Sequence, residues 1–302
     1  MKNFAPTIAL LLLVFYNGNA QQEKGIIGFN SWLNNWTEFK PNKSEYNEPN
    51  QIITGTISVD SKLYKKNVYL LMGNVYVTNK AKLTIEPGTV IIADAESKAS
   101  LVITKGASIL AEGTETDPIV FTSSKSIRKA GDWGGIILLG EAPINKFGNV
   151  ASVNFDLDAG FSSYGGTNTA SNSGILRYVR IEFAGAKVKG FGNFNALFLG
   201  GVGNQTIIEN VMASNAGGDS FEVFGGDVNL NKLISYKCSS NDFKFNYGAQ
   251  VNIKNSLAIR ASYLQSSSGS RCLYACSYDK KEEVDFTKKL TLVTATNLTF
   301  VN

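Results

Sequence analysis

Four carboxylates and a lysine gather in one stretch of this sequence, at Asp219, Glu222, Asp227, Asp242 and Lys244. The segment that begins at Asp219 resembles the segment that begins at Asp242. If the spacing between them is one turn of a repeating structure, Asp219 and Asp242 lie within ~5 Å of each other. Such a pair could bind calcium or act as the two carboxylates of a glycosidase. Lys244 would weaken a cation site and favour an acidic ligand, and the plainer alternative is that each aspartate caps a turn.

A second candidate site is centred on Trp133, in Gly131-Asp132-Trp133-Gly134-Gly135. Glycines on both sides would let a ligand approach closely, and an aromatic face can stack on a sugar ring. We therefore expect Asp132 and Trp133, with Glu222 and Asp227, to contact a ligand, although Trp133 could equally close a corner of the core. Other aromatic residues in loop-like stretches are Phe161, Tyr164, Phe191 and Phe194.

The sequence contains no histidine. This absence excludes Ser-His-Asp and Cys-His catalysis, histidine-ligated zinc and any imidazole acid or base. A polysaccharide lyase would then need arginine or lysine as its base. The candidates by residue type are Arg177, Arg180, Lys237, Lys244 and Arg260.

Internal repeats indicate the elements that hold these residues. The stretch 83–91 matches the stretch 101–109, with leucine, isoleucine and glycine at equivalent positions. Further along, short apolar stretches that begin at Ile208, Leu230 and Ile253 recur at a longer and nearly constant interval. The apolar residues alternate with period two, which is typical of strands.

Repeats of this length, each with two or three short strands, predict an all-β right-handed parallel β-helix, in which each coil stacks on the one before. An antiparallel sandwich would also show short alternating strands, but it does not require equal offsets. Leucine-rich repeats have a similar period and need an asparagine ladder and a leucine spacing that are missing here.

The expected organisation is a single solenoid domain with a polar N-terminal segment. Residues 21–66 are predicted to be poor in strands and could cover the first coil, and residues 67–302 form the solenoid. We expect loop insertions near 145–174 and 262–289, where asparagine, serine, glycine or charged residues accumulate.

Residues 1–20 have the features of a signal peptide: Lys2, a short apolar run and small residues before a cleavage site at Gln21. The apolar run is too short to span a bilayer, and no later stretch is long and apolar enough. We therefore expect export with no transmembrane segment in the mature chain.

The composition limits the classes of partner that the protein could bind. The net charge is +4 from 29 basic and 25 acidic residues, with no dense basic cluster, which argues against nucleic acid. Hydrophobic residues make up 43% of the chain, enough for a large core. The three cysteines, Cys238, Cys272 and Cys276, are expected to be small core residues, and a single bridge is the alternative.

Four ordered motifs stand out in the chain: the segments 68–73 with 83–91, 131–136, 176–185 and 219–226. Together they resemble a family of secreted, pectate-lyase-like β-helix proteins from Bacteroidota. The resemblance implies export, often by type IX secretion or as a lipoprotein, and mostly without an assigned activity. Family members tend to be acidic where this chain has residues 239–246, and only Asp242 of that cluster is present.

These observations favour an exported, non-catalytic β-helix protein that is monomeric in solution: a surface or matrix adhesin or a module that binds a polysaccharide or cell-surface glycan. One alternative is a lyase or glycoside hydrolase that acts on acidic polysaccharide, with Asp219, Asp242 and Lys244 as the catalytic candidates. Calcium held by Asp219 and Asp242 is the only cofactor the sequence suggests. A purely structural spacer is the third interpretation.

Overall fold

The computed structural model describes residues 26, 31–153, 155–190, 192–261 and 269–302. The chain forms two units, Met1–Asn34 and Asn35–Asn302, and the description below concerns the second. The expected signal peptide and Phe191 lie outside the described residues. Within the described ranges, no helix is long and apolar enough to cross a membrane.

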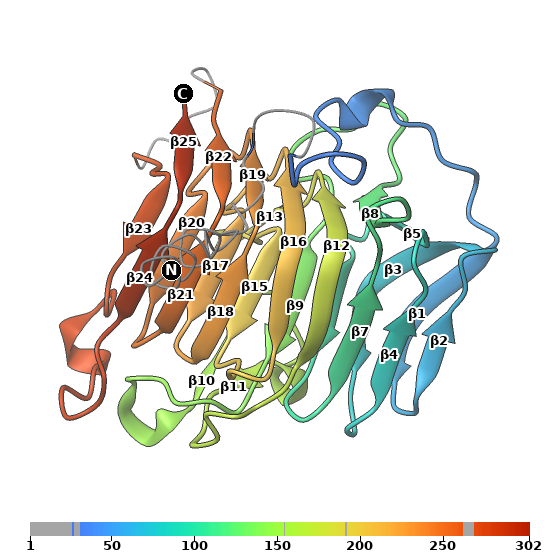
Figure 1. Cartoon of the computed structure of the whole chain (residues 1–302). Coiled ribbons are helices and arrows are strands. Elements are labelled where there is room, and N and C mark those ends of the chain that lie inside the picture. Colours follow the sequence, from blue (N-terminus) through green and yellow to red (C-terminus); the bar gives the residue numbers. More distant parts are fainter. Residues whose placement is uncertain (1–25, 27–30, 154, 191, 262–268) are drawn as a thin grey trace, which may run out of the picture. The chain divides into compact units, whose positions relative to one another are not determined.

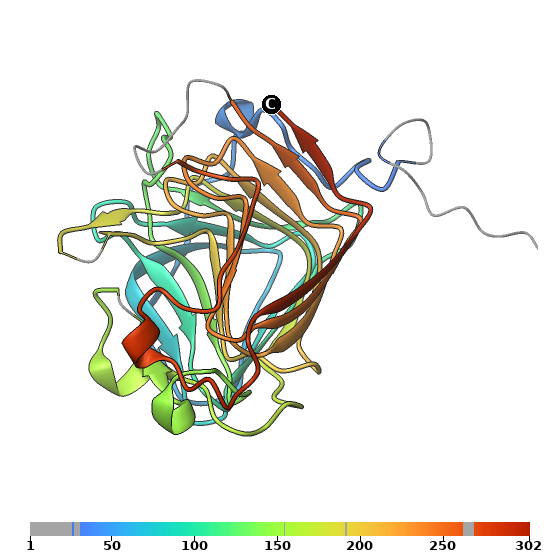
Figure 2. The same cartoon turned by 90° about the vertical axis from the view of Figure 1, so that its left-hand side faces the viewer.

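The second unit is a right-handed parallel β-helix with three faces, which we call A, B and C (Figures 1 and 2). The chain runs through A, B and C in turn, and each strand pairs in parallel with the strand one coil later. Four long strands bend at a corner and serve two faces: β1(Gln51–Ile57), β3(Val68–Val77), β12(Gly174–Glu182) and β16(Ile207–Ser214).

The remaining ladder strands belong to one face each. Face A contains the ends of β1 and β3 with β6(Ser100–Ile103), β9(Gly135–Leu139), β15(Leu197–Gly200), β17(Phe221–Phe224), β20(Phe243–Asn246) and β23(Leu273–Ala275). Face B contains β2(Ser61–Leu63), β4(Lys82–Ile85), β7(Ser108–Glu112), the starts of β12 and β16, β18(Asp227–Asn231), β21(Gln250–Lys254) and β24(Leu292–Thr296). Face C contains the starts of β1 and β3, β5(Val90–Ala93), β8(Ile119–Ser123), the ends of β12 and β16, β19(Ile234–Tyr236), β22(Leu257–Ile259) and β25(Thr299–Val301).

The corner between faces B and C is made by single residues in the left-handed region. Asn210, Lys232, Asn255 and Asn297 occupy equivalent positions in successive coils, with φ of 51°, 54°, 52° and 55°. Asparagine tolerates this conformation better than most residues. The side-chain amides of Asn255 and Asn297 also form a hydrogen bond of 3.1 Å across the coils. β16 runs through this corner as one strand, whereas two residues separate β18 from β19, β21 from β22 and β24 from β25.

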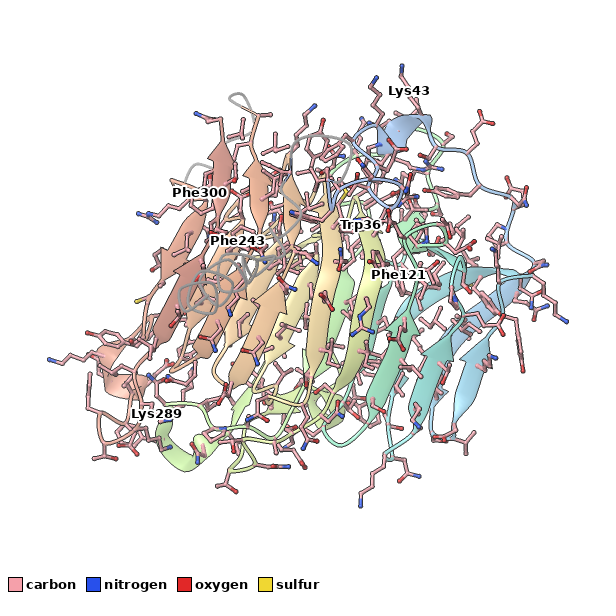
Figure 3. All side chains as sticks on the ribbon, in the orientation of Figure 1. Trp36, Lys43, Phe121, Phe243, Lys289 and Phe300 are labelled. Atoms are coloured by element: carbon pink, nitrogen blue, oxygen red, sulfur yellow. The ribbon has the colours of Figure 1, made fainter. Side chains whose placement is uncertain are left out.

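Inward-facing side chains of all three faces form one continuous apolar core. Phe221 and Phe243, one coil apart on face A, stack with ring centroids 5.6 Å apart. Phe121 stacks in the same way on Trp133 at 6.4 Å. Phe121 and Phe243 are labelled in Figure 3 and are completely buried. The alternating pattern of the sequence is thus the alternation between core and exterior.

The longer of the two repeats is confirmed as the coil register, since Ile208 pairs with Leu230 and Leu230 with Ile253. The shorter repeat is wrong as a coil register, because Leu83 pairs with Ile109 and not with Leu101. A coil in this part of the chain contains three strands and runs from Leu83 to Ile109. The shorter offset advances by only two strands and reaches a different face of the helix.

The N-terminal segment also differs from expectation. The parallel ladder begins at Gln51, inside the segment predicted to be poor in strands, because β1 and β2 pair with β3 and β4. Trp36 and Phe39 do not cover the first coil. They pack edge-on against Tyr178 and Tyr236 of later coils, where they cover aromatic side chains near face C.

The chain leaves the ladder between β9 and β12. There it forms the short hairpin β10(Ala151–Ser152) and β11(Ser163–Tyr164) with the 3₁₀ turns η2(Phe147–Asn149) and η3(Ala159–Phe161). The hairpin β13(Lys187–Val188) and β14(Gly192–Asn193) projects further on, and η1(Pro41–Lys43) precedes the ladder. The second expected protrusion, near 262–289, contains β23, which belongs to face A, and residues 262–268 lie outside the described residues. The loop after β23 carries η4(Lys281–Glu283).

The core stack gives a direct test of the register. Replacing Phe243 with alanine should lower the free energy of unfolding by about 3–5 kcal/mol, because a close-packed site between coils cannot collapse around the cavity. Urea denaturation measures this change. Phe300→Ala, on the last strand and 45% exposed, is the matched control and should change stability little (Figure 3). Equal effects of the two substitutions would contradict this packing.

Candidate functional site

One row of outward side chains on face A changes from apolar to charged along the solenoid. The ladder aligns these positions coil by coil, and we call them the outer row: Tyr76, Val102, Ile137, Phe198, Glu222, Lys244 and Tyr274. The first four are buried in a second apolar cluster, beneath the insertion between β9 and β12. Phe161 of the insertion packs on Tyr76, with ring centroids 4.9 Å apart. The row becomes charged at Glu222, beyond this apolar cluster.

A cleft of about 770 Å³ opens above the charged part of the outer row. The insertion, the β13–β14 hairpin and the loop with η4 contribute to its walls. Figure 2 shows the insertion and the η4 loop on the same side of the solenoid, and residues 146 and 284 form an isolated β-bridge between them. The lining residues are Lys146, Ser152, Val153, Phe155, Tyr164, Asn193, Asn195, Phe198, Gly217, Gly218, Asp219, Glu222, Phe224, Ser240, Lys244, Tyr247, Asp279, Lys280 and Glu283.

An ion cluster forms the floor of this cleft. The ammonium of Lys244 lies 2.6 Å from Oε1 of Glu222 and 3.6 Å from Oδ2 of Asp219. It also lies 5.4 Å from the centroid of the Phe224 ring, within reach of a cation–π interaction. Glu222 and Lys244 are adjacent because they are neighbours in the outer row.

Two asparagines fix the carboxylates. The side-chain amide of Asn195 donates to Oε2 of Glu222, and its Oδ1 accepts the backbone N–H of Asp219 at 3.0 Å. Asn241 donates its backbone and side-chain N–H groups to Oδ1 of Asp219, at 2.8 and 2.9 Å. The two carboxylates therefore have fixed and different surroundings.

Burial raises the pKa of Glu222 to about 7, and the charge of Asp219 acts in the same direction against the lowering effect of Lys244. Burial alone would lower the pKa of Lys244, but the charges of Glu222 and Asp219 outweigh it and raise that pKa above its usual value. Lys244 is therefore a permanent cation at neutral pH, whereas Glu222 changes protonation state there.

Aromatic rings line one side of the cleft. Phe155 and Phe198 have centroids 5.9 Å apart, Phe198 and Phe224 5.3 Å, and Phe224 and Tyr247 4.6 Å. Phe155 and Phe224 are only partly buried. We call these four rings the aromatic wall. It offers flat apolar surface beside the charged floor.

Tyr164 adds a polar group to the cleft. Its side chain is 2% exposed and packs edge-on against Phe198. Because Tyr164 lines the cleft, its hydroxyl can donate a hydrogen bond to a ligand there.

The rim of the cleft is held by the loop with η4. Asp279 accepts hydrogen bonds from the Tyr247 hydroxyl at 2.6 Å and from the Asn246 amide at 2.7 Å. Lys146 of the insertion pairs with Glu283 at 2.7 Å. Burial and the neighbouring charge of Asp279 raise the pKa of the Tyr247 hydroxyl, which therefore remains protonated.

The expected pairing of Asp219 with Asp242 is wrong by one residue. Phe221 pairs with Phe243, so Asp219 lies opposite Asn241 and Asp242 opposite Ser220. Both aspartates lie in the turns just before β17 and β20, and they occupy different positions in those turns. Asp242 is completely buried, where it accepts from Ser235 and Cys238 and pairs with Arg260 at 2.7 Å.

The structure therefore does not bring Asp219 and Asp242 together as a calcium site or a catalytic pair. Among the residues it describes, no group of three or more carboxylate or cysteine side chains is arranged to hold a metal ion. All three cysteines are free, with Cys238 buried and Cys272 and Cys276 partly exposed.

Trp133 is a core residue, contrary to the binding site expected there. It is completely buried, and its indole N–H donates to the carbonyl of Glu182 at 2.7 Å. Asp132 accepts from the hydroxyl of Ser123 and the backbone N–H of Lys129, and so it caps a turn. The glycines beside Trp133 let the backbones of neighbouring segments pack closely, since a side chain there would collide with them.

The other predicted residues are dispersed. Glu222 lies in the cleft as expected, but Asp227 borders a smaller cavity of about 300 Å³ beside Gln250. Phe194 packs on Phe155 below the cleft. The basic candidates have other partners: Arg177 pairs with Glu112 and Glu209, Arg180 with Glu182, Arg260 with Asp242, and Lys237 lies over the ring of Tyr236.

Several cleft residues were not anticipated from the sequence, namely Lys146, Phe155, Asn195, Phe198, Phe224, Tyr247, Asp279, Lys280 and Glu283. A signal existed for Phe198 and Phe224, because they occupy outward positions of strands whose inward positions are all apolar. For the residues on loops, no repeat indicates which coil they contact.

Residues 55–302 match the family model of the pectate-lyase-like β-helix domain. The match covers most of the chain, and the chain belongs to this family. No curated protein and no solved structure matches the chain. Membership of the family agrees with the parallel β-helix and leaves the activity of the cleft to be inferred from its residues.

The ion cluster predicts a pH-dependent effect of removing Lys244. In Lys244→Met, Glu222 and Asp219 lose their counter-ion, which at pH 8 should cost about 3–5 kcal/mol of the free energy of unfolding. Glu222 has a raised pKa, so the folded state holds a proton there that the unfolded chain releases, and this stabilisation is lost as pH rises through about 7. At pH 5 Glu222 holds this proton and has no charge for Lys244 to neutralise. The free energy of unfolding lost in Lys244→Met should therefore be smaller at pH 5 than at pH 8.

Urea denaturation of the wild-type protein and of Lys244→Met, at pH 5 and at pH 8, measures this difference. Arg177→Met is the matched control, since Arg177 also pairs with two carboxylates but on the more exposed face B. Exposed ion pairs contribute only about 0–1 kcal/mol. A loss in Lys244→Met that is the same at both pH values would contradict this account of the cluster.

Proposed function

We propose that this member of the pectate-lyase-like β-helix family is an exported protein that binds carbohydrate in the cleft on face A. The observation that carries the proposal is the aromatic wall beside the fixed polar floor. Ligand sites in proteins combine concave apolar surface with a few precisely oriented polar groups. Sugars need both, because their rings have apolar C–H faces and hydroxyl edges.

The individual contacts fit a sugar ring. Phe224 is partly exposed and lies next to Lys244, so a ring that stacks on Phe224 brings its hydroxyls to the floor. There Glu222 and Asp219 can accept hydrogen bonds, and Lys244 and Tyr164 can donate them. A bound sugar would thus have partners for both its faces and its edge.

The charges of the cleft favour a neutral glycan over the acidic polysaccharide of the enzyme alternative. Lys146, Lys244 and Lys280 line it together with four carboxylates, those of Asp219, Glu222, Asp279 and Glu283. Lys244 is already paired with two carboxylates and Lys146 with one. No excess of positive charge is therefore available to a polyanion.

The same contacts argue against a polysaccharide lyase. A lyase removes a proton beside a carboxylate group of its substrate, and of the arginine and lysine residues that the sequence suggests as its base, only Lys244 lines the cleft. Lys244 is held as a cation by two carboxylates, which is the wrong protonation state for a base. The structural spacer is the interpretation that remains if the cleft binds nothing.

Export is part of the proposal and is supported by the sequence alone. Residues 1–20 combine Lys2, an apolar run and small residues before Gln21, the pattern of a cleaved signal peptide. An exported protein with such a cleft would act on glycans at a surface or in the surroundings of the cell.

Binding can be tested by retention of the purified protein on insoluble polysaccharides and by calorimetry with soluble ones. Phe224→Ala should weaken binding about tenfold, which corresponds to ~1.4 kcal/mol, because the sugar loses its stacking surface. Phe300→Ala removes a partly exposed phenylalanine on face C that does not line the cleft, and this variant should bind like the wild type. Equal binding by all three proteins, or no retention on any polysaccharide, would contradict the proposal.

A further inference from the structure

We propose that the cleft on face A binds the terminal sugar of a glycan chain and not a segment from the middle of one. This inference rests on the proposed binding function and adds which part of the glycan is recognised. A sugar in the interior of a linear chain is linked to a neighbour on each of two sides, so its site needs two exits. A terminal sugar is linked on one side only and fits a site that is closed on the others.

The insertion between β9 and β12 closes the end of the cleft that faces the earlier coils. The ring centroid of Phe155, from the insertion, lies 4.5 Å from that of Phe194 and 5.9 Å from that of Phe198. Val153 and Tyr164, also from the insertion, are buried in the same apolar cluster as Phe198. Val153, Phe155 and Tyr164 all line the cleft. A chain in the cleft is therefore blocked from continuing along the outer row toward β9.

Hydrogen bonds fix this closed end to the solenoid. The hydroxyl of Tyr76 accepts the backbone N–H of Asp158 at 2.9 Å. The side-chain amide of Asn74 donates to the carbonyl of Asp156 at 2.9 Å. Tyr76 and Asn74 belong to β3, so the insertion reaches back over the outer row as far as the start of face A.

A second wall stands at the corner between faces A and B. The ammonium of Lys146 lies 2.7 Å from Oε2 of Glu283 and 4.3 Å from the centroid of the Tyr247 ring. The backbone N–H of Asp285 donates to the carbonyl of Asn145 at 2.8 Å, beside the isolated β-bridge that joins the insertion to the loop with η4. Tyr247 directly follows β20, which places this wall at the corner where face A ends.

The β13–β14 hairpin forms the third wall, at the corner between faces C and A. The side-chain amide of Asn193 donates to the carbonyl of Gly217 at 2.6 Å, and both residues line the cleft. Gly217 lies between β16, which ends on face C, and β17 on face A. On the fourth side the outer row continues from Lys244 to the partly exposed Tyr274. The rest of a bound chain can leave in that direction.

The closed end also offers partners for the group that distinguishes a terminal sugar. A terminal sugar has a hydroxyl where an interior sugar has a glycosidic oxygen. The hydroxyl both donates and accepts hydrogen bonds, whereas the glycosidic oxygen can only accept. The hydroxyls of Ser152 and Tyr164 line this end of the cleft, and each can pair with the additional hydroxyl.

The stoichiometry of binding tests the proposal. The full chain is titrated by calorimetry with linear amylose, xylan and mannan, each as long chains and after partial acid hydrolysis, with the chain ends counted by a reducing-end assay. The number of binding sites per gram of sugar should rise in proportion to the ends, about tenfold for a tenfold increase, while Kd per site stays the same. Binding to chain interiors would leave the number of sites per gram nearly constant.

A variant at the closed end locates the terminal sugar. Phe155→Ala should weaken binding of the disaccharide (maltose, xylobiose or mannobiose) and of the matching long chain by the same factor, about tenfold, because the terminal sugar contacts this ring in both. Phe147→Ala is the matched control. Phe147 belongs to the same insertion, is 61% exposed and does not line the cleft, so both ligands should bind as they do to the wild type. Circular dichroism checks that each variant is folded.

The outcomes separate the two proposals. A number of sites per gram that does not change with chain length would overturn recognition of the chain end and leave glycan binding intact. Weaker binding of the long chain by Phe155→Ala, with the disaccharide unaffected, would also overturn it. No binding of any chain, long or short, would overturn the binding function and recognition of the chain end with it.

Discussion

The parallel pairing of each coil with the next is the constraint on which the rest of this molecule depends. Because the strands stack in register, residues at the same position in successive coils form rows, and every row is either inside or outside. The inside rows make the apolar core. On face A, one outside row passes from the buried Phe198 to the charged Glu222 and Lys244, and this change determines where the cleft lies.

Much of this architecture can be predicted from the sequence, because a solenoid repeats its pattern. The recurrence from Ile208 to Leu230 to Ile253 specifies the coil length and the inside row correctly. The error at Asp219 and Asp242 is instructive for the same reason. Their resemblance aligned these two aspartates, whereas the ladder pairs Phe221 with Phe243, so that the aspartates occupy different positions in their turns and Asp242 lies in the core.

The walls of the cleft could not be predicted in this way. Tyr164, Phe155 and Lys146 come from an insertion, and Asp279 and Glu283 from another loop, neither of which repeats. Loops meet through tertiary contacts such as the pair Lys146–Glu283, which no periodic pattern encodes. At Trp133 the sequence predicted a ligand site where there is none. Glycines beside an aromatic residue are as typical of close backbone packing around a core residue as they are of a ligand site.

The most direct measurement is a crystal structure of the protein with a bound neutral oligosaccharide. The account predicts a sugar ring stacked on Phe224, with its polar edge within hydrogen-bonding distance of Glu222, Asp219 and the Tyr164 hydroxyl. An oligosaccharide bound on another face while the cleft stays empty would contradict it. So would a register that places Asp242 beside Asp219 in the cleft.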